Sequence, residues 1–179
     1  MAQFEAFAPN VEVGGRSIRL VLDTMGLFER MSKNIFAKHG IVEIADEGWY
    51  SQQAYLDVYR ELYEKVGAKT MKLIGKQVPN KVLWPPNIRT IVEALASIDV
   101  AYHMNNRGGE IGYYRFESTG ERAGRMVCYN PYPCPFDEGL IEATAAKFAP
   151  AGARVRVKHD ETQPCRLKGA DSCAYLISW

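Results

Sequence analysis

The hydrophobic pattern of this chain changes its period once, near Gly109, and that change limits the possible folds more than any other feature. Before Gly109, apolar residues recur every three or four positions, as they do in amphipathic helices. After Gly109, apolar and polar residues alternate, as they do in half-buried strands. The sequence therefore predicts an α+β fold, in which a helical N-terminal half packs on a four-stranded antiparallel sheet from the C-terminal half.

The helical half is expected to span residues 17–104, after an irregular arm at residues 1–16. Gly40, Gly67 and Pro79 mark expected helix ends, because glycine tolerates positive φ and proline cannot continue a helix. The first three expected helices are 19–39, 51–66 and 68–77. Asn87 is expected to cap a fourth helix, whose apolar face includes Ile98.

The C-terminal half, residues 110–179, is expected to contain strands and one helix in the order ββαββ. The expected strands are 111–117, 125–130, 154–159 and 172–179, and the helix begins near Asp137 and ends at Pro150. No repeat, low-complexity tract or long linker divides the sequence. Residues 1–179 are therefore expected to form a single domain.

The charge balance excludes some classes of partner. Lys and Arg number 22 and Asp and Glu number 21, which gives a net charge of +1. A surface that binds nucleic acid without sequence preference needs an excess of cations, so no nucleic acid is expected. No apolar stretch is long enough for a membrane span, and the N-terminus lacks the pattern of a secretory signal. The expected location is the cytoplasm, where cysteines stay reduced.

Three of the four cysteines are expected to come together in space. Cys165 and Cys173 flank a turn at Gly169, so a hairpin centred there places them opposite each other on one face of a β-ribbon. Cys134 lies between two prolines before the expected helix, where the helix dipole favours a thiolate. The fourth cysteine, Cys128, lies on the second strand of the sheet.

Three interpretations of these cysteines stay open. They are small buried core side chains, or Cys134, Cys165 and Cys173 bind zinc, or Cys165 and Cys173 form a disulfide, which a reducing cytoplasm disfavours. Because zinc accepts sulfur, nitrogen and oxygen donors, its fourth ligand is Glu161, His159 or Cys128. No CxxC motif is present to select between these interpretations.

The sequence contains no phosphate-binding loop, nucleophile elbow, dinucleotide fingerprint or haem-attachment motif. The remaining catalytic interpretation uses Cys134 as a nucleophile and His159 as its base. His103, at the end of the fourth expected helix, is the best candidate for a polar group in a ligand pocket, with helix capping as its alternative role.

The C-terminal part of the chain resembles the vinyl-four-reductase family of small-molecule-binding domains. The resemblance covers about residues 110–179. It rests on a strand pair, Cys134 and Gly139 at a helix opening, a further strand, and Cys165-x7-Cys173 with a glycine in the turn. Relatives of this family include the aromatic-sensing domains of enhancer-dependent bacterial transcription activators.

The resemblance implies a buried pocket for a small hydrophobic or aromatic ligand between the helices and the sheet, usually in a homodimer. Trp84, His103, Tyr113 and Phe116 are the expected wall residues of this pocket.

The resemblance also implies a structural zinc ion held by three cysteines and an acidic residue. The cysteines correspond to Cys134, Cys165 and Cys173, and the acidic position falls on Thr162. Glu161 is adjacent, and a bulge at Pro164 would bring it into reach as the fourth ligand.

The predicted function is thus a small-molecule-binding sensor or regulatory domain. One alternative is an enzyme that acts on a small hydrophobic, aromatic or tetrapyrrole-like substrate. The other is a protein-interaction module with a filled core, because fold alone does not determine function.

Overall fold

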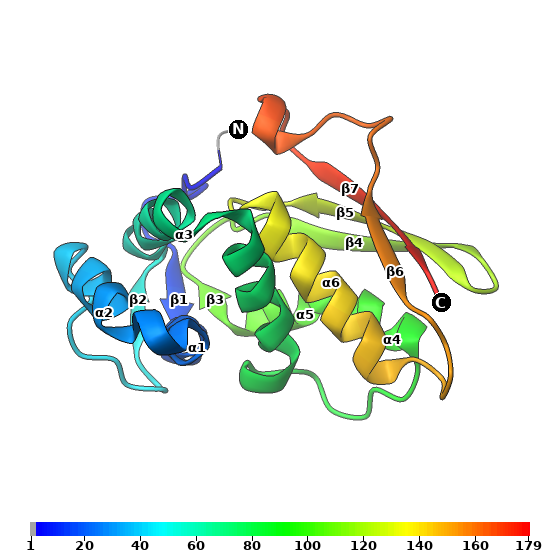
Figure 1. Cartoon of the computed structure of the whole chain (residues 1–179), viewed down its shortest axis with the longest axis horizontal. Coiled ribbons are helices and arrows are strands. Elements are labelled where there is room, and N and C mark those ends of the chain that lie inside the picture. The colour runs from blue at the N-terminus through cyan, green and yellow to red at the C-terminus, as the bar shows by residue number, and fades with distance from the viewer. Residues whose placement is uncertain (1–2) are drawn as a thin grey trace.

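The structure is a computed structural model, and it describes residues 3–179. Met1 and Ala2 of the expected arm lie outside the described residues. The architecture is α+β, as the sequence predicts, with helices gathered on one side of a four-stranded antiparallel sheet (Figure 1).

The first expected helix is in fact two helices. Helix α1 covers Gly15–Met25, a 3-10 turn covers Gly26–Phe28, and α2 covers Glu29–Lys38. The expectation of one helix over 19–39 is wrong because Gly26 adopts a φ of 45° at the end of α1, and that conformation interrupts the helical hydrogen bonds. The apolar stripe continues across the break, so the periodicity alone does not reveal it.

Helix α3 covers Gln52–Lys81, and Gly67 divides it with a φ of 75° and a ψ of 178°. The two expected helices on either side of Gly67 are therefore confirmed. Ser51 caps the first of them, since its side-chain oxygen accepts a hydrogen bond from the backbone N–H of Ala54. Pro79 does not stop the second, which ends two residues later at Lys81.

The fourth expected helix is also divided, into α4 (Ile91–Ala96) and α5 (Ile98–Met104). The expected cap at Asn87 is wrong. Thr90 caps α4 instead, because Thr90 and Glu93 form a capping box of reciprocal hydrogen bonds to backbone N–H groups.

A small sheet in the first half was not anticipated. Strands β1 (Glu12–Gly14), β2 (Trp49–Ser51) and β3 (Asn106–Arg107) pair antiparallel in the order β2-β1-β3. Part of the expected irregular arm is therefore a strand. These strands contain only two or three residues each, too few to show an alternating pattern.

The second half has the expected ββαββ order. Its elements are β4 (Tyr113–Gly120), β5 (Ala123–Tyr129), α6 (Cys134–Phe148), β6 (Arg156–His159) and β7 (Cys173–Ser178). The sheet order is β4-β5-β7-β6, and all its pairings are antiparallel. Helix α6 begins at Cys134, one turn before the expected cap at Asp137.

Helix α6 packs along the part of α3 that follows Gly67 (Figure 1). The contact depends on two glycines. A Cβ at Gly75 would lie 2.1 Å from the carbonyl oxygen of Phe136, and a Cβ at Gly139 would lie 2.1 Å from that of Lys72. The two backbones therefore touch directly, and this contact positions the N-terminus of α6 against the sheet.

One cluster of buried apolar side chains includes residues from α1, α3, α6 and the four-stranded sheet. Both halves thus contribute to the same core, although the single-domain prediction itself stays a prediction. Within residues 3–179, no helix has the length and apolar character needed to cross a membrane.

Candidate functional site

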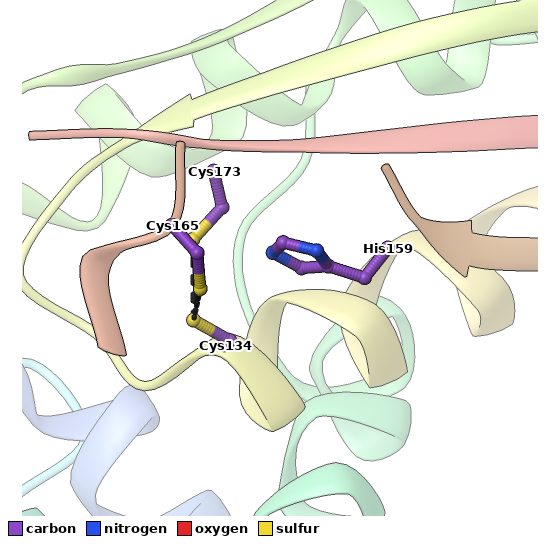
Figure 2. Close-up of side chains that lie close together, drawn as sticks. All are labelled: Cys134, His159, Cys165 and Cys173. Atoms are coloured by element: carbon purple, nitrogen blue, oxygen red, sulfur yellow. Dashed lines mark hydrogen bonds between the residues drawn. The ribbon is translucent and has the colours of Figure 1, made fainter. Parts of the chain in front are cut away.

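Three cysteines and one histidine meet between the N-terminus of α6 and the end of the sheet (Figure 2). Cys134 is the first residue of α6, His159 is the last of β6, and Cys173 is the first of β7. Cys165 immediately precedes a 3-10 turn (Arg166–Lys168) in the connection between β6 and β7. We call these four residues the Cys–His cluster.

The cluster has the dimensions of a tetrahedral metal site. The Sγ atom of Cys134 lies 3.1 Å from that of Cys173 and 3.7 Å from that of Cys165, and Cys165 and Cys173 are 3.7 Å apart. All four candidate ligand atoms lie within 4.8 Å of one another. A zinc tetrahedron with Zn–S bonds of about 2.3 Å has edges of roughly 3.8 Å, so the sulfur atoms need to move little to bind one ion.

His159 faces the three sulfur atoms in Figure 2. Its Nε2 atom is buried and has no hydrogen-bond partner among the described residues. Its ring packs edge-on against Tyr175, with 5.1 Å between the ring centroids. A buried imidazole nitrogen without a partner is costly unless it binds something, such as a metal ion.

The predicted ligand Glu161 is exposed and lies outside the cluster. The expected hairpin at Gly169 is also wrong. Cys165 lies in a loop stabilised by 3-10 hydrogen bonds, and the residue paired with Cys173 across the sheet is Cys128. Because all four cysteines are free, no disulfide joins Cys165 to Cys173.

Arg166 supplies a buried positive charge beside the thiols. Its backbone N–H and its Nε–H each donate to the Sγ of Cys173 at 3.4 Å. The hydrogen bond from Cys134 and the positive charge of Arg166 lower the pKa of Cys173. The hydrogen bond to Cys173 and burial raise the pKa of Cys134. The thiolate expected at Cys134 therefore forms more easily at Cys173.

Arg166 also links the cluster to the rest of the core. It is 4% exposed and forms an ion pair with the fully buried Asp137. Asp137 accepts a hydrogen bond of 2.7 Å from the hydroxyl of Tyr114. Asn130 accepts a bond of 2.6 Å from Arg166 and donates to Asp137. A continuous polar chain thus connects Cys173 to Tyr114.

Tyr114 belongs to the wall of a cavity between the helices and β4. The cavity has a free volume of about 60 Å³, enough for a few water molecules or a molecule of similar size. Its walls are mostly apolar or aromatic and come from α1, α3, α5, β4 and α6. The lining residues are Ser17, Leu20, Tyr55, Tyr59, Val78, Val82, Trp84, Ile98, Ala101, Tyr102, Asn105, Asn106, Tyr114, Tyr132, Phe136 and Leu140.

Of the four expected wall residues, the structure places only Trp84 at this cavity. Tyr113 is next to the lining residue Tyr114, but successive side chains of a strand point to opposite faces. Phe116 lies further along β4 and packs over Gly124. His103 projects from the outer side of α5, where its Nδ1 lies 2.9 Å from the backbone oxygen of Asp99.

Sequence reasoning did not identify the tyrosines that dominate the cavity wall. Tyr55 and Tyr59 are one helical turn apart on the buried face of α3 and look like ordinary core residues in the sequence. Their role as wall residues depends on how α3 packs against distant segments that also line the cavity, such as the one that carries Tyr132, and no local pattern encodes that packing.

No protein-family model and no curated protein matches this chain. Solved structures do match, and they define the fold as that of H-NOX proteins. The identities are about 14–15%, so the likeness concerns the fold alone.

An H-NOX protein from S. oneidensis in the Fe(II)NO ligation state has 14% identity and a TM-score of 0.67, over 92% of this chain and 98% of the other. The unliganded Fe(II) H-NOX protein from K. algicida has 14% identity and a TM-score of 0.63, over 92% and 95%. A mutant of the T. tengcongensis H-NOX protein has 14% identity and a TM-score of 0.62, over 90% and 94%.

These matches correct the resemblance to the vinyl-four-reductase family. The structural neighbours are H-NOX domains, and no family model supports the resemblance. The cysteine spacing suggested the wrong family because the same strand–helix–strand order, with cysteines at its ends, fits more than one α+β topology.

Proposed function

We propose that this chain is a small-molecule-binding sensor or regulatory domain. The observation that carries the proposal is the cavity between the helices and β4, with mostly apolar walls and a few polar groups, as ligand sites have. The polar chain from Tyr114 to Cys173 runs from this wall into the sheet. It offers a physical connection between the wall of the cavity and the Cys–His cluster.

The fold likeness supports a sensing role by analogy. The similar proteins are H-NOX proteins. One of their structures is of an Fe(II)NO state, and another comes from work on haem distortion in that family. Those proteins and this chain align over more than nine-tenths of this chain's length. The ligand of this chain must be inferred from the residues that line its own cavity.

We further propose that the Cys–His cluster holds a structural zinc ion. Three sulfur donors and one nitrogen donor suit zinc, and a closed set of four protein ligands is typical of structural sites. Zinc would also supply the partner that Nε2 of His159 lacks. Glu161 is replaced by His159 in this ligand set.

The expected homodimer stays a prediction, which light scattering after size-exclusion chromatography tests.

The ligand-binding proposal is tested by methyl and amide NMR spectra under xenon pressure, because xenon enters dry apolar cavities. The expected result is a set of shifts in the methyl signals of Leu20, Val78 and Leu140, which line the cavity. If none of these signals moves with xenon or with small uncharged organic molecules, the cavity is filled in solution and the proposal fails.

The zinc proposal is tested by elemental analysis of freshly purified protein. The expected result is about one zinc ion per chain, lost in Cys165→Ser but retained in Cys128→Ser. The second variant is the matched control, because Cys128 is an equally buried cysteine outside the cluster. Metal-free protein with full thermal stability would contradict the proposal.

A further inference from the structure

The cavity has no histidine, cysteine or methionine to bind haem iron. Haem iron is ordinarily bound by His, Cys, Met or a tyrosinate, and of these residue types only tyrosine is among the lining residues. Each histidine of the chain is engaged elsewhere. His39 contacts Glu61 at 3.1 Å, His103 lies outside on α5, and His159 belongs to the Cys–His cluster.

The tyrosines of the wall are poor substitutes for these ligands. A tyrosine binds iron as the phenolate, and burial raises the pKa of all five wall tyrosines, which are Tyr55, Tyr59, Tyr102, Tyr114 and Tyr132. Three of their hydroxyls also donate hydrogen bonds within the protein. Tyr55 donates to the backbone oxygen of Ser17, Tyr102 to that of Ile111, and Tyr114 to Asp137. Binding iron would break these bonds inside the core.

The cavity also lacks cations for the carboxylates of an iron porphyrin. No Arg or Lys lines it. The nearest buried cation in the polar chain is Arg166, which is already neutralised by Asp137 and donates to Cys173. A buried carboxylate without a cation or hydrogen-bond donors is strongly disfavoured.

The small volume of the cavity also argues against an iron porphyrin. A free volume of about 60 Å³ is far below the roughly 300 Å³ or more of pockets that enclose larger organic ligands. A macrocycle would have to displace several of the aromatic rings, and these rings pack on one another. Tyr59, for example, packs edge-on against both Tyr132 and Phe136 at 5.5 Å.

One lining residue of the cavity has a polar group without a partner. The indole Nε1–H of Trp84 is buried and has no hydrogen-bond partner among the described residues. An indole N–H is only a donor, so it requires an acceptor. Behind the wall, the fully buried Gln52 also has an unpaired Oε1, while its amide nitrogen donates to Asn106 at 3.2 Å.

We propose that this cavity takes a small uncharged molecule with a hydrogen-bond acceptor, such as a carbonyl oxygen, which Trp84 binds, and that it does not take an iron porphyrin. The inference rests on the proposed sensor function and narrows its ligand class. The aromatic and aliphatic walls enclose the apolar part of the ligand, and Nε1 of Trp84 orients its acceptor.

The experiment compares two probes of the same shape, 2-butanone and 2-methyl-1-butene, in which a C=O group is replaced by C=CH2. The full chain is titrated with each probe and followed by its tryptophan indole N–H signals in NMR. Trp84→Phe assigns the relevant signal and removes the donor. Trp49→Phe is the control, since Trp49 does not line the cavity.

The expected result is a downfield shift of the Trp84 indole signal with 2-butanone but not with the hydrocarbon. The ratio of the two dissociation constants should change about fivefold in Trp84→Phe, as one neutral hydrogen bond implies. It should not change in Trp49→Phe. A haemin titration should give no stoichiometric complex.

Two results overturn the inference and leave the sensor proposal standing. One is a ratio of dissociation constants that Trp84→Phe does not alter, although both probes bind. The other is a stoichiometric haemin complex with a sharp Soret band. If neither probe nor xenon perturbs any cavity signal, the sensor proposal itself fails, and the inference fails with it.

Discussion

His159 completes the Cys–His cluster, although no spacing motif in the sequence singles it out from Glu161 and Cys128. It qualifies through position and orientation: it ends β6, it faces the sulfur atoms, and its Nε2 atom lacks a partner. Glu161 follows the end of β6 and turns out to solvent.

The first prediction separates these two residues. His159→Ala should lower zinc affinity by at least about tenfold, because it removes one of four ligands. Glu161→Gln should leave the affinity unchanged. Competition with a chromogenic zinc chelator measures both. Equal losses in the two variants would show that the fourth ligand has been wrongly assigned.

Arg166 is the second residue whose environment allows a sharp prediction. Arg166→Leu leaves Asp137 buried without its cation, so it should lower the free energy of unfolding by about 3–5 kcal/mol. Arg166→Lys should not restore stability fully, because a lysine cannot contact Asp137 and Asn130 together as the guanidinium does.

The double variant Arg166→Leu with Asp137→Leu is the control for that prediction. Removing both charges should recover at least about 1 kcal/mol relative to Arg166→Leu alone. Urea unfolding followed by circular dichroism provides the comparison. A double variant that is less stable than either single variant would mean that the ion pair is not the main interaction of Arg166.

At the scale of elements, the contact between α3 and α6 determines where the two candidate sites lie. Cys134, Phe136 and Asp137 all occupy the first turn of α6, and that turn is placed by the contact at Gly75 and Gly139. Ion pairs from Lys72 to Glu138 and Glu142 lie beside the same contact.

The third prediction concerns Gly139→Ala. Helix propensity alone would make this change stabilising by up to about 1 kcal/mol. The added Cβ would lie 2.1 Å from a backbone oxygen of α3, so α6 must move. The cost of overpacking should therefore exceed the gain in helix propensity, with a net loss of about 1–3 kcal/mol or more in the free energy of unfolding. Ala146→Gly, at an exposed position of α6, is the control that reports propensity alone.

Chemical denaturation of both variants measures the two effects. Gly139→Ala should also reduce zinc affinity, since it displaces Cys134, whereas Ala146→Gly should not. A stabilised Gly139→Ala variant would show that the helices are further apart in solution than in the structure.

For the whole molecule, the Cys–His cluster connects segments that are distant in the chain. It joins α6, the end of β6, the connection at residues 160–172 and the start of β7. If the cluster holds the proposed zinc ion, the ion closes long loops in the unfolded chain and adds its binding free energy to folding.

The fourth prediction is that removing zinc with a chelator lowers Tm by roughly 10 °C, as expected for a loss of about 3 kcal/mol in a chain of this size. Hydrogen exchange should increase first in residues 160–172, because Cys165 holds that connection in place. Calorimetry and exchange mass spectrometry measure the two effects. Uniform exchange across the chain would argue against a local role for the ion.

Most features set by nearby residues could be predicted from the sequence, and features set by distant segments could not. The helical character of the first half, the ββαββ order and the division of α3 at Gly67 follow from local patterns and were predicted. The small sheet and the register that pairs Cys173 with Cys128 depend on distant partners, and local patterns do not contain them. The break at Gly26 is local, but the apolar stripe continues across it and hides it.

By itself, the sequence determined the fold class, because the period of apolar residues selects helix or strand within a few turns of chain. It also identified the three cysteines and Trp84 as residues of interest. Only the tertiary structure decided that His159 joins those cysteines, and that tyrosines and Trp84 surround a small cavity whose lining includes no Arg, Lys, His, Cys or Met. The physical reason is that a metal site and a cavity are properties of the space between segments, and packing alone sets that space.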